Sequence, residues 1–112
     1  MLVIYGLSAD ESRVAIACVR AIAEGPWFPP GDNGEDQELQ TLVGFTRDEL
    51  REIHKRLLDE IMPDKNAMRA IGQCVLTVVH GFGMSADVPR WVAASVQVVE
   101  ALCDKWFREI DP

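Results

Sequence analysis

The chain contains 112 residues, of which 18 are acidic and 11 basic, and its formal net charge is −7. A chain of this length can bury one hydrophobic core without metals or disulfides, but it is too short to join a cofactor domain to a substrate domain. Nucleic acids and anionic membranes are bound through clustered Lys and Arg, so the acidic balance argues against both kinds of partner. We therefore expect one domain over residues 1–112.

The sequence offers no targeting or membrane-spanning segment. The apolar run at residues 2–5 is too short for a signal-peptide core and has no basic flank. The longest uncharged stretch, residues 70–86, contains Gly, Gln, His and Ser and is too short to span a membrane. We therefore expect a cytoplasmic protein.

The three cysteines, Cys18, Cys74 and Cys103, lie far apart in the sequence. An odd number without a Cys-x-x-Cys pair argues against a disulfide framework and against a zinc cluster. Free cysteine is among the most buried residue types, so we predict three reduced thiols on the buried faces of helices.

The first predicted helix covers residues 8–24. Ser8 and Glu11 have the spacing of a capping box, in which each side chain binds the backbone N–H of the other residue. The Gly-Pro pair at residues 25–26 ends this helix, since proline restricts the residue before it. For the apolar residues 1–5 we predict a packed extension rather than a strand, because an isolated strand would not be stable.

A Pro- and Gly-rich acidic loop is predicted over residues 25–38. Three prolines and two glycines fall within residues 26–34, which leaves no room for a helix or a central strand. One short helix is expected within residues 35–43, with Leu39, Leu42 and Val43 facing inward.

A second capping box, Thr46 with Glu49, opens the next predicted helix over residues 46–62, which ends before Pro63. Its apolar residues follow helical spacing and are predicted to be buried. They are Leu50, Ile53, Leu57, Leu58 and Ile61.

Two further helices complete the predicted fold. The helix over residues 64–81 begins at the cap residue Asp64, is apolar over most of its circumference as central helices are, and ends at Gly81 and Gly83. The last helix covers residues 87–109, with Pro89 in its first turn. The predicted fold class is therefore all-α, a single small bundle of four main helices plus one short helix.

The two histidines form no catalytic pattern. His54 lies on the apolar face of its helix, as a structural imidazole would, and His80 lies in a last helical turn, where positive charge suits the helix dipole. The sequence has no metal-ligand spacing, nucleophile elbow or phosphate-binding loop. We predict no catalytic residue, no metal and no cofactor, although a pocket holding either histidine against a carboxylate would favour an enzyme.

Acidic residues concentrate beside an aromatic pair in the predicted loop. Residues 32–46 contain four acids and no base. Aromatic side chains on a stiff loop supply contact area at low entropic cost, and carboxylates steer a basic partner. The predicted partner-binding residues are Trp27, Phe28, Asp32, Glu35, Asp36 and Glu38. In the alternative interpretation, the aromatic pair folds back over the end of the bundle and the acids only solvate the loop.

A DNA-binding helix-turn-helix is an alternative because four basic residues share the helix over residues 46–62. They are Arg47, Arg51, Lys55 and Arg56. Five acidic residues are interleaved with them, which is typical of a solvated helix face, whereas a DNA-reading helix needs a net basic surface.

One local resemblance can be stated. The stretch Leu42-Val43-Gly44-Phe45-Thr46-Arg47-Asp48-Glu49-Leu50, followed by a later helix ending in Lys105-Trp106, resembles a pattern in small uncharacterised bacterial all-helical proteins. This resemblance implies no activity and no functional residue. In size, acidity and helical character the chain is also similar to bacterial immunity proteins, which implies an inhibitor of a basic toxin.

These features together predict a non-catalytic protein-binding module, either an immunity-type inhibitor or a small adaptor, with a basic protein as its partner. Residues 87–110 are also predicted to form a homodimer interface, because they are apolar over more of the helix than one core contact requires. The residues behind this prediction are Trp91, Val92, Val98, Val99, Leu102, Trp106, Phe107 and Ile110. The alternatives are a DNA-binding regulator and a small-molecule-binding or catalytic bundle.

Overall fold

The computed structural model describes residues 1–31, 36–82 and 85–111, and within these ranges the chain forms helices and no strand. The helices are α1 (Ala9–Glu24), α2 (Gln37–Val43), α3 (Arg47–Leu58), α4 (Lys65–Phe82), α5 (Val88–Val92) and α6 (Val96–Lys105), followed by the π-helical turn η1 (Trp106–Ile110). The predicted all-α class is confirmed. The predicted count is wrong in detail, since the described residues contain six α-helices.

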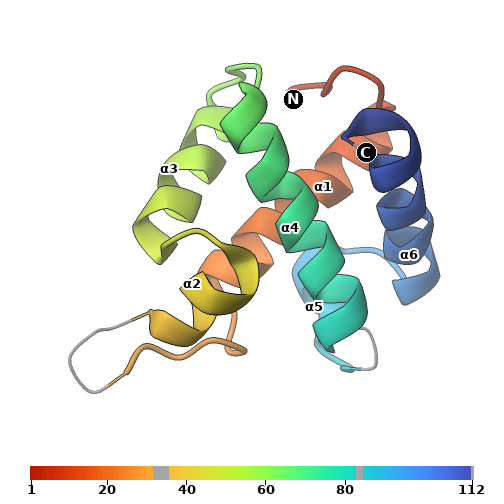
Figure 1. The fold of residues 1–112 in the computed structure, drawn as a ribbon. Helices are drawn as coiled ribbons and strands as arrows, with labels where there is room; N and C mark the ends of the chain where they lie inside the picture. Colours follow the sequence, from red (N-terminus) through yellow and green to blue (C-terminus); the bar gives the residue numbers. More distant parts are fainter. Residues whose placement is uncertain (32–35, 83–84, 112) are drawn as a thin grey trace.

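Helices α1 and α4 cross at the centre of the molecule, with α3 on one side and α6 on the other (Figure 1). Helix α1 packs against α3, α4 and α5, while α4 also packs against α2 and α6. Nine of the sixteen residues of α1 are buried, so the predicted central helix, α4, shares the centre with α1. None of the described helices is both long and apolar enough to cross a membrane.

Both predicted capping boxes are formed, and they fix where α1 and α3 begin. Ser8 Oγ accepts a hydrogen bond from Glu11 N at 3.1 Å, and Glu11 Oε1 accepts one from Ser8 N at 2.8 Å. Thr46 and Glu49 exchange the same two bonds at 3.1 and 2.9 Å. Each box satisfies two N–H groups that a helix start would otherwise leave unpaired.

Helix α3 ends four residues before the predicted boundary, at Leu58. The residue before Pro63 is restricted to extended backbone, so the chain must turn toward α4 earlier. Glu60 makes this turn with φ at 62°, and Ile61 N donates to the carbonyl oxygen of Arg56 at 2.9 Å. Leu58 and Ile61, predicted to be buried, are therefore 63% and 51% exposed.

The predicted helix over residues 87–109 is interrupted at Ala93, which adopts a left-handed conformation with φ at 52°. Ser95 then caps α6 by accepting a hydrogen bond from Val98 N at 3.3 Å. Arg13 of α1 donates to the carbonyl oxygens of Val92 and Ala93 at 3.2 and 3.3 Å. An arginine far away in the sequence thus satisfies the carbonyls that the break leaves without helical partners.

Two smaller predictions about helix ends and faces are also corrected. Gly81 lies inside α4, which continues to Phe82, so it is not the predicted cap, and Gly83 lies outside the described residues. Leu42 is 58% exposed, whereas Leu39 and Val43 of the same helix face the core as predicted. At the start of α4 the predicted cap is formed, since Asp64 Oδ1 accepts a hydrogen bond from Ala67 N at 2.8 Å.

The prediction of three buried thiols is confirmed, because Cys18, Cys74 and Cys103 are all free and buried. Burial raises the pKa of Cys18 to about 12 and raises that of Cys74 as well, since the thiolate loses its hydration. At neutral pH these thiols stay protonated and poorly nucleophilic.

We therefore expect Cys18 and Cys74, which are 0% exposed, to react with a thiol reagent only as fast as the protein unfolds. Cys103 lines an open hollow, so the labelling of at most one thiol per chain should be rapid in buffer, and urea should raise the total to three. Rapid labelling of Cys18 or Cys74 without denaturant would contradict their burial.

Candidate functional site

Arg47, at the start of α3, has a buried side chain that joins three segments of the chain. It is 8% exposed, and its guanidinium donates hydrogen bonds to the carbonyl oxygens of Ala23 and Phe28. Its Nε donates to Asp36 Oδ1 at 3.0 Å, which adds an ion pair. The planar, multiply donating guanidinium therefore fixes the end of α1, the backbone after α1 and the start of α2 relative to one another.

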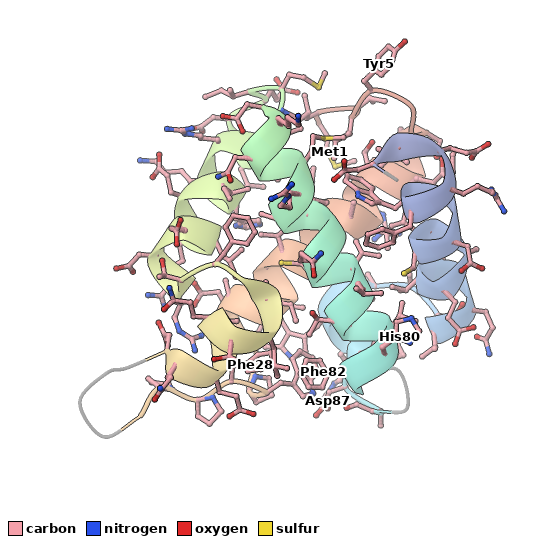
Figure 2. All side chains as sticks on the ribbon, viewed as in Figure 1. Met1, Tyr5, Phe28, His80, Phe82 and Asp87 are labelled. Atoms are coloured by element: carbon pink, nitrogen blue, oxygen red, sulfur yellow. The ribbon has the colours of Figure 1, made fainter. Side chains whose placement is uncertain are left out.

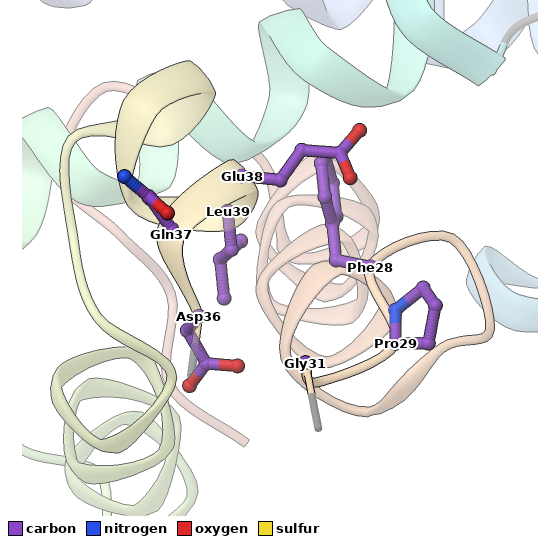
Figure 3. Close-up of a pocket in the computed structure, with 7 residues that line it drawn as sticks. All are labelled: Phe28, Pro29, Gly31, Asp36, Gln37, Glu38 and Leu39. Atoms are coloured by element: carbon purple, nitrogen blue, oxygen red, sulfur yellow. The ribbon is translucent and has the colours of Figure 1, made fainter. Parts of the chain in front are cut away.

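Two residues held by Arg47, Phe28 and Asp36, also line a hollow of about 230 Å³ between the segment after α1 and the first turn of α2 (Figure 3). Phe28 and Leu39 are only 3% and 1% exposed, so they form a fixed apolar floor. Glu38 is exposed at the rim. The described residues that line it are Phe28, Pro29, Gly31, Asp36, Gln37, Glu38 and Leu39.

The charges around this hollow, called the 28–39 hollow below, are of one sign. Its lining includes two carboxylates and no basic residue among those described. Arg47 balances the charge of Asp36, whereas Glu38 forms no ion pair with any described residue. A cation that entered would meet the carboxylate of Glu38, which no described residue neutralises, above an apolar floor. The volume lies below the roughly 300–1,000 Å³ of small-molecule pockets, so the hollow suits a single side chain better than a cofactor.

The predicted aromatic pair is packed into the molecule rather than displayed on the loop. Trp27 stacks on Phe82 of α4 with ring centroids 5.0 Å apart, and its edge meets Trp91 of α5 at 6.1 Å. Phe28 meets Phe82 edge-on at 5.4 Å. These contacts are those of the alternative interpretation, in which the pair covers the end of the bundle. Figure 2 shows Phe28 and Phe82 at this end of the molecule.

The structure thus brings together only part of the predicted partner-binding set. Asp36 and Glu38 line the 28–39 hollow with Phe28, and Trp27 lies in the adjoining aromatic cluster. Asp32 and Glu35 lie outside the described residues. Arg47 organises the site, although it is not among the residues predicted to form it. Its spacing of eleven residues from Asp36 matches no local motif, so only the fold reveals the pair.

His80 lies beside an open hollow of about 490 Å³ that Asp104 and Arg108 also line, at the junction of α4 with α6 and η1. A hollow that holds a histidine beside a carboxylate is the arrangement that would favour the small-molecule-binding or catalytic alternative. His80 makes no hydrogen bond or ion pair with another described residue, so no described group orients its imidazole for proton transfer.

His54 is half-buried on α3, as predicted for a structural imidazole. Burial, reinforced by the nearby positive charge of Arg20, lowers the pKa of His54, while Glu24 partly opposes this shift. The neutral form is therefore favoured near neutral pH.

The basic residues of α3 are mostly engaged within the chain. Arg47 is buried, Arg51 pairs with Glu24 at 2.6 Å, and Arg56 pairs with Glu52 at 3.3 Å. Among the four residues that raised the DNA-binding alternative, only Lys55 has no ion pair with a described residue. These pairs leave little positive charge for phosphates.

The apolar strip behind the predicted homodimer interface is largely used by the core. Val92, Val99, Leu102 and Trp106 are at most 2% exposed, and Val98, at 44%, is the one large apolar residue of that set with an exposed side chain. Helices α1 and α4 cover the remainder, since both pack against the 88–110 region.

Comparison with protein-family models, with curated proteins and with solved structures finds no match for this chain. The function must therefore be argued from the chemistry of its own surface.

Proposed function

We propose that this chain is a non-catalytic protein-binding module that receives a lysine side chain of a basic partner in the 28–39 hollow. The observation that carries the proposal is the combination of an apolar floor, Phe28 and Leu39, with the exposed carboxylate of Glu38, which pairs with none of the described residues, on a framework fixed by buried Arg47. The aliphatic stem of a long basic side chain packs on the floor, and its charged head reaches Glu38.

The sequence predicted that the aromatic residues of this chain contact the partner, whereas in the proposed complex this chain receives a side chain of the partner. Phe28 cannot leave the core to serve as an anchor, because it is 3% exposed and its carbonyl oxygen binds Arg47. The anchor therefore comes from the partner, and this chain supplies the receptor. A receptor that is already fixed loses little conformational entropy on binding, which favours affinity.

The overall charge assists the encounter. A net charge of −7 attracts a basic protein from a distance and repels acidic ones, and the attraction weakens as salt screens it. Both an immunity-type inhibitor and a small adaptor would use this combination of long-range steering and a side-chain receptor.

Affinity capture from a lysate of the native host tests the proposal with three matched baits: the wild-type chain, Glu38→Gln and Glu100→Gln. Both variants remove one exposed carboxylate, so they change the net charge equally, but Glu100 lies on α6, away from the hollow. We expect a basic protein to be retained by the wild type and by Glu100→Gln, and its recovery to fall roughly tenfold with Glu38→Gln.

The same capture at higher ionic strength should recover less of that protein. Equal recovery with all three baits would contradict the proposed site, and recovery of acidic proteins alone would contradict the proposed kind of partner.

A further inference from the structure

The N-terminal segment, residues 1–5, is apolar on both of its faces. Leu2 and Ile4 are buried, at 8% and 0% exposure, whereas Met1, Val3 and Tyr5 point outward and are 67%, 47% and 87% exposed. Side chains of an extended segment alternate between faces, and a segment that is apolar on both is normally covered on both. In this chain no described residue covers the outer face.

Tyr5 is displayed on a turn that the fold holds in place. Leu7 N donates to the carbonyl oxygen of Ile4 at 3.0 Å, and Ile4 N donates to the buried Ser12 Oγ at 2.8 Å. Gly6 has φ at 89°, a backbone conformation that favours glycine, and a Cβ there would meet only the end of the Ile110 side chain, 2.6 Å from its Cδ1. The backbone that carries the most exposed large apolar residue of the described chain is thus held in place, and a tyrosine side chain, with two χ angles, supplies contact area at low entropic cost.

The connection between α3 and α4 lies at the same end of the molecule as the N-terminus (Figure 1). Residues of α3, of this connection and of the start of α4 line an apolar hollow. Its volume is about 210 Å³, and its apolar lining includes Ile61 and Met62, which are 51% and 52% exposed. The amino group of Met1 pairs with Glu60 Oε1 at 3.1 Å, which joins the N-terminal segment to this connection. The charged rim of the hollow is formed by Arg56 and Asp64.

The charge of this end favours a second copy of the chain over a strongly basic or acidic partner. Two copies with a net charge of −7 repel one another over most of their surfaces. Residues 55–69 are an exception, because they contain four basic and three acidic residues. These are Lys55, Arg56, Lys65 and Arg69 against Asp59, Glu60 and Asp64.

We propose that this end of the molecule is a homodimer interface in which Tyr5 of each copy packs against Ile61 and Met62 of the other. A two-fold interface must be self-complementary, and this surface offers both a protruding aromatic side chain and an apolar hollow, inside a rim of mixed charge. Figure 2 shows Tyr5 and Phe28 at opposite ends of the molecule, so the dimer leaves the 28–39 hollow open. The proposal is independent of the proposed function.

Sedimentation equilibrium over a concentration series tests this interface with the wild type, Tyr5→Ser, Met62→Ser and Val98→Ser. Val98 is an exposed apolar residue on α6, within the segment that the sequence alone predicted to dimerise, so its variant is the matched control. We expect the wild type to approach twice 12.5 kDa at high micromolar concentration. Tyr5→Ser and Met62→Ser should each raise the dimer dissociation constant at least about tenfold, and Val98→Ser should leave it unchanged.

Three results would overturn the proposal: a wild-type mass of 12.5 kDa throughout the series, a dimer unaffected by Tyr5→Ser and Met62→Ser, or a dimer weakened chiefly by Val98→Ser. Tyr5 and Met62 are 87% and 52% exposed, so thermal melts at a concentration low enough for the wild type to be monomeric should be the same for the wild type and both variants, which separates a lost interface from a lost fold.

Discussion

Replacing Arg47 with alanine is expected to lower the free energy of unfolding by about 3–5 kcal/mol, a large part of the stability of a small domain. The substitution leaves the carbonyl oxygens of Ala23 and Phe28 without their donor. It also leaves the carboxylate of Asp36 without its ion-pair partner. Buried groups that lose their partners cost far more than exposed ones.

Urea unfolding followed by circular dichroism measures this loss, with Arg51→Ala as the matched control. Arg51 is also an arginine of α3 and pairs with Glu24, but both side chains are about half exposed, so its removal should change stability much less. Arg47→Lys should fall between the wild type and Arg47→Ala, because lysine keeps the charge but lacks the fork of donors. Equal urea midpoints for Arg47→Ala and Arg51→Ala would contradict the organising role of Arg47.

Replacing Gly72 with alanine is expected to destabilise the protein by about 1–3 kcal/mol through overpacking. In an exposed helix the same change would stabilise by roughly 1 kcal/mol, because alanine is the better helix former. Gly72 of α4 is buried, and a Cβ there would lie 2.4 Å from Trp106 Nε1. The indole cannot move aside, because Trp106 is 0% exposed.

A double-mutant cycle with Trp106→Phe isolates this contact. Phenylalanine lacks the indole nitrogen, and Trp106 Nε1 has no hydrogen-bond partner among the described residues, so Trp106→Phe removes the clash without breaking a hydrogen bond. Gly72→Ala should therefore cost less in the Trp106→Phe background than in the wild type. Equal costs in both backgrounds would show that Gly72 and Trp106 do not constrain each other.

The starts of α1 and α3 were predictable from the sequence because they depend on local chemistry. Ser8 with Glu11 and Thr46 with Glu49 form bonds across three residues, so their spacing alone identifies them. The break in the predicted last helix was not predictable in this way. It depends on Arg13, which satisfies the carbonyl oxygen of Val92 from 79 residues away.

The candidate site was predictable only as a region. Charge counting identified the acids near residues 32–38, and two of them line the 28–39 hollow. Whether Phe28 faces solvent or the core depends on Phe82 and Arg47, which lie far from it in the sequence. In the sequence, Arg47 is one of several charged residues of α3, and nothing local distinguishes it from the exposed ones. It is buried because its partners, Ala23, Phe28 and Asp36, come from other segments of the chain.

The most direct measurement of the proposed binding mode is zero-length carbodiimide cross-linking of the captured complex, followed by mass spectrometry of the linked peptides. This reagent joins a carboxylate to an amine that already lies in contact with it. We predict a link between Glu38 and a lysine of the partner, and its loss in Glu38→Gln while Glu100→Gln retains it. Links confined to carboxylates away from the hollow, such as Glu100 or Asp104, would contradict the proposal that the 28–39 hollow receives the partner's basic side chain.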